Sequence, residues 1–331
     1  MNQFEHIAVL GAGAWGTALA YTAQQAGRKV TMLAREEEVA EALSAGRGNP
    51  AYLPGVKLPA IETSIDVSVL KGAGAVLAVV PAQFARENFR AVREAIAPGT
   101  PVLLCAKGIE QSTLSLMTDV LTEELPEAVP AVLSGPSFAA DVARGLPTAV
   151  TLACSDGELG HDLMAAIGRD LFRPYWSDDL VGAEIGGAVK NVLAIACGMV
   201  EGLQLGRSAH AALLTRGFAE MTRLGIAMGG RADTLAGLSG LGDLVLTCSS
   251  VQSRNMSFGK ALGEGRSAEA VLAERRAVTE GAATAPAIVQ LAIRHEVDMP
   301  ICTAVAGILG GHITVGEAME GLLARPFKGE T

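Results

Sequence analysis

Short apolar runs alternate with helical patterns through the first half of the chain. The run HIAVL at 6–10 ends at a glycine, a helical pattern follows over 15–25, and a second apolar run lies at 29–34. Continuous apolar runs of this length are typical of strands that are buried on both faces of a parallel sheet. Four more runs of this kind lie at 74–80, 100–108, 130–137 and 148–154. The alternation predicts an α/β fold, a Rossmann-type doubly wound parallel sheet with helices on both faces.

The pattern changes after about residue 176. Strand signals nearly disappear, and helical periodicities separated by glycine loops take their place, at 181–202, 208–229, 255–263, 281–295 and 314–324. We therefore expect two domains, with the sheet in residues 1–178 and an all-helical C-terminal domain in residues 179–331.

The composition is that of a folded, globular protein. Of 331 residues, 50% are hydrophobic and 18% are charged, and this length suits two domains. The formal net charge is −9 and no long basic tract occurs, which argues against nucleic acid as the partner. A small anionic ligand is compatible with this balance, because a few local cations can attract it whatever the total charge.

The cysteines, the histidines and the N-terminus bear on the compartment and on metals. The five cysteines are scattered without a Cys-x-x-Cys pair, so we expect core residues in a reducing compartment rather than a metal or redox site. The histidines show no metal-ligand spacing. The N-terminus carries Glu5 and no basic leader, and the apolar run at 185–200 contains a lysine and is too short to span a bilayer. These features predict a cytoplasmic protein with no transmembrane segment and no metal.

A glycine motif follows the first predicted strand directly. GAGAWG places Gly11, Gly13 and Gly16 in the order G-x-G-x-x-G at the start of a helix. In this context the motif indicates a dinucleotide-binding loop, in which the glycines allow a tight turn, approach to the pyrophosphate and close helix–strand packing. The helix N-terminus then offers free N–H groups to phosphate. A purely structural turn is the alternative interpretation.

The end of the second strand bears on the choice of dinucleotide. An NAD-selective site usually has an acidic residue here, whereas this chain has Arg35, which could pair with the 2′-phosphate of NADP. One of the acids at 36–38 could reach the ribose. We favour the alternative that these acids form the solvated first turn of a helix, where negative charge suits the helix dipole.

One lysine, Lys190, lies in the middle of the apolar helical run at 185–200. Burial of an ammonium group costs several kcal/mol unless a partner compensates it. Its neighbours three and four positions away are Gly186, Gly187, Leu193 and Ala194, and none of these can pair with it. The lysine therefore needs a partner from elsewhere in the fold.

Further polar residues lie where a substrate of an open α/β sheet binds. Lys107 follows the carboxyl end of a strand, and Gly135, Ser137 and Ala139 follow the end of the next one. An ordinary surface lysine is the alternative for Lys107. In the helical half, Asp243 lies in a glycine-rich loop, and Ser253, Arg254 and Asn255 lie at a predicted helix start. Guanidinium, hydroxyl, amide and helix dipole together would bind phosphate, although Ser253 or Asn255 could be only an N-cap.

These motifs recur in the same order in the bacterial-type NAD(P)-dependent glycerol-3-phosphate dehydrogenases, which the chain resembles from Ile7 to the closing LLARPFKGE. The motifs are GAGAWGTALA, CAKGIE, LSGPSFAADV, AVKNVLAIACG, GLGDLVLTC, SRN and VTEG. The resemblance implies reversible reduction of dihydroxyacetone phosphate to sn-glycerol 3-phosphate for glycerophospholipid synthesis. It implies NAD(P)H as the cofactor, with NADPH accepted or preferred.

The resemblance also implies roles for single residues. Lys190 matches the proton acceptor of the oxidation direction, and we expect Asp243 and Lys107 beside it. Substrate contacts match Lys107, Gly135, Ser137, Lys190, Asp243, Ser253, Arg254 and Asn255. Cofactor contacts match Gly11, Gly13, Ala14, Trp15, Gly16, Arg35, Lys107, Ala139, Arg254, Val278 and Glu280. Ala14 departs from the serine of many members, which removes a possible hydroxyl contact to the pyrophosphate.

The mechanism that follows uses Lys190 as the acid–base group. As an ammonium it would protonate the substrate oxygen during reduction, and burial with Lys107 and Arg254 nearby should lower its pKa. Asp243 would orient the lysine and limit that decrease. The rival interpretations are a β-hydroxyacid or sugar-acid dehydrogenase of similar architecture, and a nucleotide-sensing protein that has lost catalysis. By analogy with other helical second domains we expect a homodimer.

Overall fold

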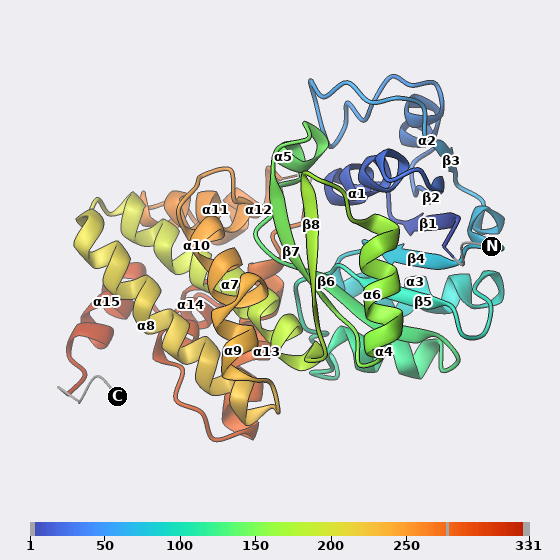
Figure 1. Ribbon diagram of the computed structural model, residues 1–331. Helices are drawn as coiled ribbons and strands as arrows, with labels where there is room; N and C mark the ends of the chain where they lie inside the picture. Colours follow the sequence, from blue (N-terminus) through green and yellow to red (C-terminus); the bar gives the residue numbers. More distant parts are fainter. Residues whose placement is uncertain (1–3, 276–277, 327–331) are drawn as a thin grey trace.

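In the computed structural model, which describes residues 4–275 and 278–326, an eight-stranded sheet forms the first half of the chain and helices form the second (Figure 1). The strand order is β3-β2-β1-β4-β5-β6-β7-β8. All neighbouring strands pair in parallel except β6 and β7, which are antiparallel. The strands are β1 (His6–Leu10), β2 (Lys29–Leu33), β3 (Glu62–Ser64), β4 (Ala75–Ala78), β5 (Pro101–Leu104), β6 (Val129–Ser134), β7 (Thr148–Ala153) and β8 (Phe172–Ser177).

The predicted Rossmann-type sheet is confirmed. The sequence did not reveal two of its strands, β3 and β8, or the antiparallel direction of β7. β3 is short and polar, and β8 is an edge strand with exposed alternate residues and an internal proline, so neither shows an apolar run. The antiparallel direction of β7 was missed because apolar content carries no information on strand direction. The runs predicted at 100–108 and 130–137 end as strands at Leu104 and Ser134. Their last residues form loops at the edge of the sheet.

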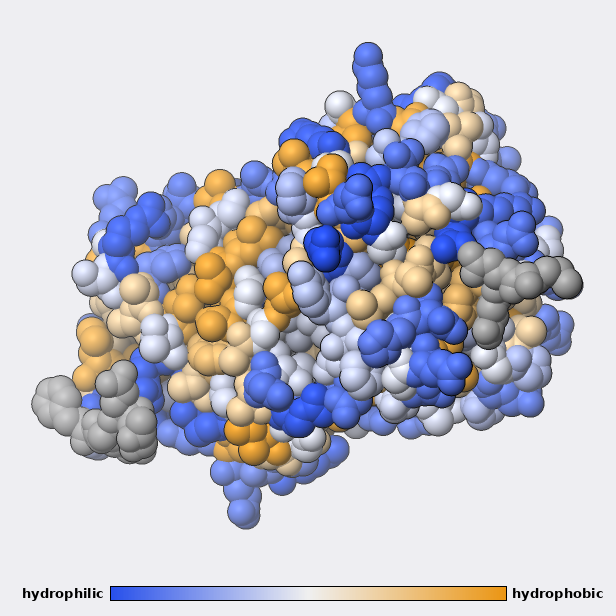
Figure 2. All heavy atoms as spheres, viewed as in Figure 1, coloured by the Kyte–Doolittle hydropathy of each residue, from blue (hydrophilic) through white to orange (hydrophobic). Residues whose placement is uncertain are grey.

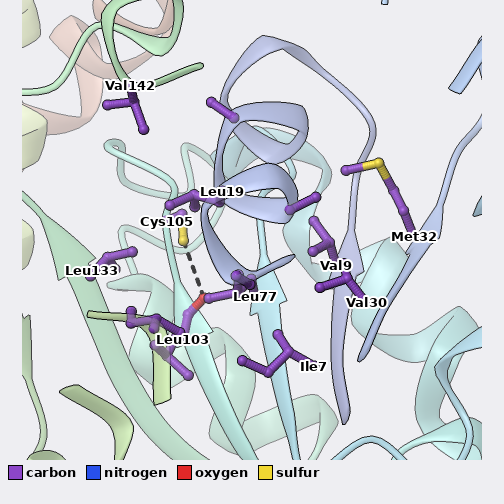
Figure 3. Packing of buried hydrophobic residues seen from close by; sticks show 14 of the residues in the cluster. Ile7, Val9, Leu19, Val30, Met32, Leu77, Leu103, Cys105, Leu133 and Val142 are labelled. Carbon is purple, nitrogen blue, oxygen red and sulfur yellow. Dashed lines mark hydrogen bonds between the residues drawn. The ribbon is translucent and has the colours of Figure 1, made fainter. Parts of the chain in front are cut away.

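Helices cover both faces of the sheet, as the alternating side chains of each strand require. Ile7 and Val9 pack with Leu19 in the core of one face, which Figure 3 shows from close by. Ala8 and Leu10 point to the opposite core, which includes Phe89. The helices of this half are α1 (Ala14–Gln25), α2 (Glu37–Ser44), α3 (Ala82–Val92), α4 (Met117–Glu124), α5 (Ala139–Ala143) and α6 (Gly157–Ile167).

The second half is helical throughout residues 180–275 and 278–323, as predicted. Its helices are α7 (Leu180–Gly202), α8 (Gly206–Ala227), α9 (Ala232–Ala236), α10 (Asp243–Cys248), α11 (Arg254–Gly263), α12 (Ala268–Ala273), α13 (Glu280–Arg294), α14 (Pro300–Leu309) and α15 (Val315–Leu323), with a π-helical turn at Leu238–Gly242. The sequence did not predict α9, α10 and α12, which have five or six residues each, or α14, which has ten. The closing motif at 322–330 lies partly outside the described residues.

The long helix α7 is the core of the helical half. It has 23 residues, so the expectation that this run is too short to span a bilayer is wrong about its length. The helix extends beyond the apolar run at both ends. Its most apolar window is 89% buried inside the fold, and this burial accounts for its hydropathy. The five cysteines are buried with free thiols, as expected of core residues.

Helices α7 and α11 run side by side at backbone distance. A Cβ atom on Gly259 would lie 1.9 Å from the backbone oxygen of Ile195, and one on Gly198 would lie 2.1 Å from that of Met256. One turn further along, a Cβ on Gly263 would lie 2.4 Å from the backbone oxygen of Met199. Glycine therefore permits this contact, and two of the three facing pairs, Ile195 with Gly259 and Met199 with Gly263, differ by 64 in number. The helices are parallel and in a fixed register.

A buried carboxyl joins α7 to the sheet half. The side chain of Glu184 accepts hydrogen bonds from the backbone N–H (3.0 Å) and the hydroxyl (2.7 Å) of Thr118, in the first turn of α4. Glu184 thereby caps a helix whose own N-cap residue, Leu116, has no polar side chain. Burial raises the pKa of Glu184 to about 7, although the two hydrogen bonds favour the charged form.

Replacing Glu184 by glutamine is expected to remove a pH-dependent part of the stability. The pKa of Glu184 is about 7 in the folded state and 4.5 in the unfolded state. The stability that this difference contributes is therefore fully present below pH 4.5 and is lost as the pH rises through about 7. The free energy of unfolding of the wild type relative to Glu184→Gln should fall by about 2–3 kcal/mol between about pH 5 and 8. Urea unfolding at several pH values measures this difference, and a difference that is constant with pH would contradict the assignment.

Candidate active site

The glycine loop lies at the carboxyl end of β1, where the strand order reverses between β1 and β4. Gly11 has φ +111°, which a residue with a side chain rarely adopts, and a Cβ on Gly16 would lie 1.9 Å from the backbone oxygen of Gly11. A Cβ on Gly13 would meet no atom within 4 Å. Two of the glycines are therefore required by packing, and the third faces open space at the N-terminus of α1.

The surroundings of this loop fit an oxygen-rich ligand such as a dinucleotide. The indole N–H of Trp15 is buried and has no hydrogen-bond partner among the described residues. Asn49 is buried and holds the loop through its side-chain amide, which donates to the backbone oxygen of Ala12 (2.9 Å) and to the hydroxyl of Thr17 (2.8 Å). Ala14 is the first residue of α1 and offers no hydroxyl, so its contribution here is a backbone N–H.

Arg35 lies beyond the end of β2 with its side chain 84% exposed. Its guanidinium binds the carboxylate of Glu36 at 2.6 Å, and the Tyr52 hydroxyl donates to the same oxygen at 2.9 Å. Burial opposes the charge of Glu36, but these two partners hold its pKa below the ordinary value. Glu37 and Glu38 are exposed in the first turn of α2, which fits the favoured interpretation of these acids. Glu36 differs from them because it is partly buried and faces the arginine.

Lys190 finds its partner in Asp243, as its isolation on α7 requires. The Lys190 ammonium donates to Asp243 Oδ1 at 2.8 Å, and the Lys107 ammonium donates to Asp243 Oδ2 at 2.7 Å. Lys107 also donates to the backbone oxygen of Gly135 at 3.0 Å. Lys190 and Asp243 are buried. The fold thus brings together residues from the loops after β5 and β6 and from α7 and α10, which are far apart in the sequence.

Thr247 completes this cluster, one turn after Asp243 on α10. Its hydroxyl accepts a hydrogen bond from Lys190 (2.9 Å) and donates one to Asp243 (3.1 Å). Burial lowers the pKa of Lys190 to about 8, with Lys107 lowering it further and Asp243 raising it. Burial also opposes the charge of Asp243, but Lys107 and Lys190 hold its pKa below the ordinary value. The result is a lysine that can exchange a proton near neutral pH.

A chain of amides connects this cluster to α11 and α13. Asn191 donates to the backbone oxygen of Lys107 (2.8 Å), Asn255 donates to Asn191 (2.8 Å), and the backbone N–H of Gly281 donates to Asn255 (3.0 Å). The side chain of Asn255, expected at the phosphate, is therefore bound to protein groups at both ends. Its geometry indicates that it aligns the helices, and its role as a substrate contact stays a prediction.

Ser253 and Arg254 lie at the start of α11. The Ser253 hydroxyl accepts from the backbone N–H of Met256 at 3.2 Å, so the N-cap alternative for Ser253 is present in the structure. Arg254 is exposed, and its guanidinium has no ion-pair or hydrogen-bond partner among the described residues. An unpaired guanidinium at a helix N-terminus is available to bind an anion.

The remaining predicted residues lie in two loops around this cluster. Ser137 donates to the backbone oxygen of Gly135 at 3.0 Å, and Ala139 is the first residue of α5. Glu280, at the start of α13, accepts from the backbone N–H of Ala82 at 3.3 Å. Val278 lies next to it and shares a small pocket with Glu280 and Ala82. These contacts bring α13 against the carboxyl end of β4.

Two glycines on α7, Gly186 and Gly187, lie against neighbouring parts of the fold. A Cβ on Gly186 would lie 2.7 Å from the backbone oxygen of Ser239, within the helical half. One on Gly187 would lie 3.1 Å from Ser134 Oγ and 3.3 Å from Lys107 Cγ. Gly186 therefore permits helix packing, and Gly187 permits close contact with the sheet half.

No role for Thr247, Asn191 or Tyr52 was apparent from the sequence. The position of Thr247 could have been predicted in part, because it lies four residues after Asp243 and therefore on the same face of the helix. The partners of Asn191 depend on the register between α7 and α11, and Tyr52 reaches Glu36 across a loop. Within residues 4–275 and 278–326, no group of three or more His, Cys, Asp or Glu side chains could hold a metal ion.

The glycine loop at the reversal of strand order and the proton-exchanging lysine at the same edge of the sheet belong to one class of protein, the nicotinamide-dependent dehydrogenases. Comparison with known sequences defines the family. Residues 6–160 match the family described as NAD-dependent glycerol-3-phosphate dehydrogenase N-terminus, and residues 179–320 match the corresponding C-terminus. The chain belongs to the NAD-dependent glycerol-3-phosphate dehydrogenase family.

Individual relatives agree over the whole chain. A Maricaulis maris protein named glycerol-3-phosphate dehydrogenase [NAD(P)+] is 60% identical over 332 residues, covering 100% of both chains. A Rhodospirillum rubrum protein of the same name is 58% identical, covering 100% of this chain and 95% of its own. The crystal structure of glycerol-3-phosphate dehydrogenase from Coxiella burnetii has a TM-score of 0.92 and 39% identity, covering 98% of this chain and 100% of that one.

Proposed function

We propose that this protein catalyses the reversible NAD(P)H-dependent reduction of dihydroxyacetone phosphate to sn-glycerol 3-phosphate. The observation that carries the proposal is the buried cluster of Lys190, Asp243 and Lys107, with the unpaired Arg254 at the start of the adjacent helix α11. Asn191 and Asn255, the residues that follow Lys190 and Arg254, are hydrogen-bonded to each other at 2.8 Å, so the two helices meet at this point. A proton donor and an anion-binding cation are thus carried by two helices that pack together, as a phosphorylated ketone requires.

The residues divide the work of the reaction. NAD(P)H supplies the hydride when it is bound. Lys190, as an ammonium, stabilises the negative charge that develops on the substrate oxygen and protonates it, and as a neutral amine it removes the hydroxyl proton in the reverse direction. Asp243 orients Lys190 and keeps its pKa near 8 against the effects of burial and of Lys107. Arg254 and Ser253 hold the phosphate, and this binding positions the carbonyl.

The cofactor contacts follow the edge of the sheet. The backbone N–H groups after Gly13, together with Trp15, bind the pyrophosphate of the cofactor. Arg35 gives up its ion pair with Glu36 and binds the 2′-phosphate of NADPH instead. The proposed domains are a dinucleotide-binding domain over residues 1–178 and a substrate-binding, catalytic domain over residues 179–331. The end of β8 at Ser177 and the start of α7 at Leu180 support this division.

We infer that the protein acts as a cytoplasmic homodimer in glycerophospholipid synthesis. Figure 2 shows apolar surface gathered over the helical half, and exposed apolar side chains there include Ile226, Val245 and Ile293. Such surface is commonly covered by a second subunit. Analytical ultracentrifugation tests the dimer.

Loss of nicotinamide absorbance with dihydroxyacetone phosphate tests the activity directly, with NADH and NADPH in separate reactions. Activity with 3-hydroxy acids or sugar acids and none with dihydroxyacetone phosphate would favour the rival hydroxyacid dehydrogenase. Binding of nucleotide without turnover of either substrate would favour a sensing protein. Lys190, Asp243 and Arg254 are all present, which supports the enzyme.

Replacing Arg35 by alanine is expected to lower the NADPH:NADH ratio of kcat/KM about tenfold or more, because a charge-assisted bond to the 2′-phosphate is lost. Steady-state rates with each cofactor measure the ratio. Arg47→Ala, an exposed arginine after α2, is the matched control and should keep the ratio of the wild type. An Arg35→Ala enzyme that also keeps it would refute the contact.

A further inference from the structure

Arg275 lies outside the residues assigned above and fastens the start of α11. Its guanidinium donates to the backbone oxygen of Arg254 (Nη1, 2.6 Å) and to the hydroxyl of Ser257 (Nη2, 3.1 Å). The Ser257 hydroxyl in turn donates to the same Arg254 oxygen at 3.1 Å. The guanidinium carbon lies 5.5 Å from the ring centroid of Phe258. Arg254 is therefore held at its main chain while its own guanidinium stays unpaired.

The charges around Arg275 indicate an anion site. Glu274, its neighbour in sequence, binds Arg266 at 2.5 Å, and no carboxylate pairs with Arg254 or Arg275 within the described part of the chain. Burial lowers the pKa of Arg275, and the positive charge of Arg254 lowers it further. Two like charges held close together repel each other until an anion binds near both.

We propose that Arg275 is a positioning residue that aims Arg254 at a phosphate group of the bound ligands. This inference rests on the proposed function, in which Arg254 holds phosphate. The planar fork of the Arg275 guanidinium suits it to bind two oxygens of the first turn of α11 at once, one through each terminal nitrogen. The phosphate of the substrate is the expected ligand, and the pyrophosphate of the dinucleotide is the other source of the same chemistry.

Kinetics of Arg275→Gln test the proposal. We expect KM for dihydroxyacetone phosphate and Ki for inorganic phosphate to rise about tenfold, with kcat within about threefold of the wild type. kcat/KM for dihydroxyacetone, which lacks the phosphate, should not change. Arg266→Gln, which removes a nearby positive charge that does not contact Arg254, is the control and should leave all these values unchanged. A weaker Kd for NADPH with unchanged KM for substrate would assign the phosphate to the dinucleotide.

Two results would overturn this role. One is unchanged KM, Ki and NADPH Kd in Arg275→Gln while Arg254→Gln raises KM and Ki, which leaves the proposed function standing. The other is an equal loss with dihydroxyacetone and with dihydroxyacetone phosphate, which identifies a general structural defect. If Arg254→Gln also leaves KM and Ki unchanged, the phosphate assignment in the proposed function is wrong as well.

Discussion

Replacing Lys190 by alanine is expected to lower kcat by about two to four powers of ten, as for the loss of a general acid–base group. The reason is local, because Lys190 is the buried ammonium that Asp243 and Thr247 hold at 2.8 and 2.9 Å. The glycine loop and Arg35 lie on other elements, so the Kd for NADPH should stay within about threefold of the wild type. Steady-state rates and fluorescence titration with NADPH measure the two quantities.

The matched control for this substitution is Lys260→Ala on the adjacent α11. Lys260 is partly exposed and pairs with Glu264 at 3.7 Å, so its loss should leave kcat unchanged. Turnover of Lys190→Ala close to that of Lys260→Ala would exclude an acid–base role for Lys190.

Replacing Asp243 by asparagine is expected to lower kcat by about two powers of ten through misplacement of the lysine. Asp243 raises the pKa of Lys190 and Lys107 lowers it, so the substitution should move that pKa below about 8. The rate of ketone reduction, which needs the ammonium, should therefore decline from a lower pH than in the wild type. Two lysines would also be left without their carboxylate, which should cost about 3–5 kcal/mol of stability.

A pH profile of kcat and urea unfolding measure these two effects of Asp243→Asn. Thr247→Val is an informative companion, because it removes one hydrogen bond to Lys190 and keeps the carboxylate. It should lower kcat less than Asp243→Asn does. A pH profile of Asp243→Asn that coincides with that of the wild type would show that Asp243 does not control the lysine.

The sequence predicts those parts of the molecule that depend on local pattern. The strand at 6–10 and the glycine loop after it follow from apolar periodicity, and the end of the strand at Leu104 places Lys107 at the edge of the sheet. The need of Lys190 for a partner follows from the cost of burying an ammonium. That Asp243 meets both lysines is a tertiary fact, since 53 residues separate it from Lys190 and 136 from Lys107.

Other features lie beyond the reach of a single sequence for physical reasons. β8 alternates buried and exposed residues at a sheet edge, so its composition resembles a loop. The contacts of Asn191 and Asn255 depend on the register of two helices, which glycines at 198, 259 and 263 determine only once the helices meet. Arg275 looks like any surface arginine until the start of α11 is placed beside it.

The contact between α7 and α11 also bears on which substrates the site can accept. At Gly198, Gly259 and Gly263 main chain lies against main chain, so no side chain can change its conformation to move one helix along the other. The spacing between the main chains of Lys190 and Arg254 is then determined by this backbone contact. Under the proposed roles, the packing of the two helices therefore selects the distance between the carbonyl and the phosphate of the substrate. A ketone whose carbonyl lies one carbon further from its phosphate would bind Arg254 through the phosphate, but its carbonyl oxygen would not be correctly placed at Lys190.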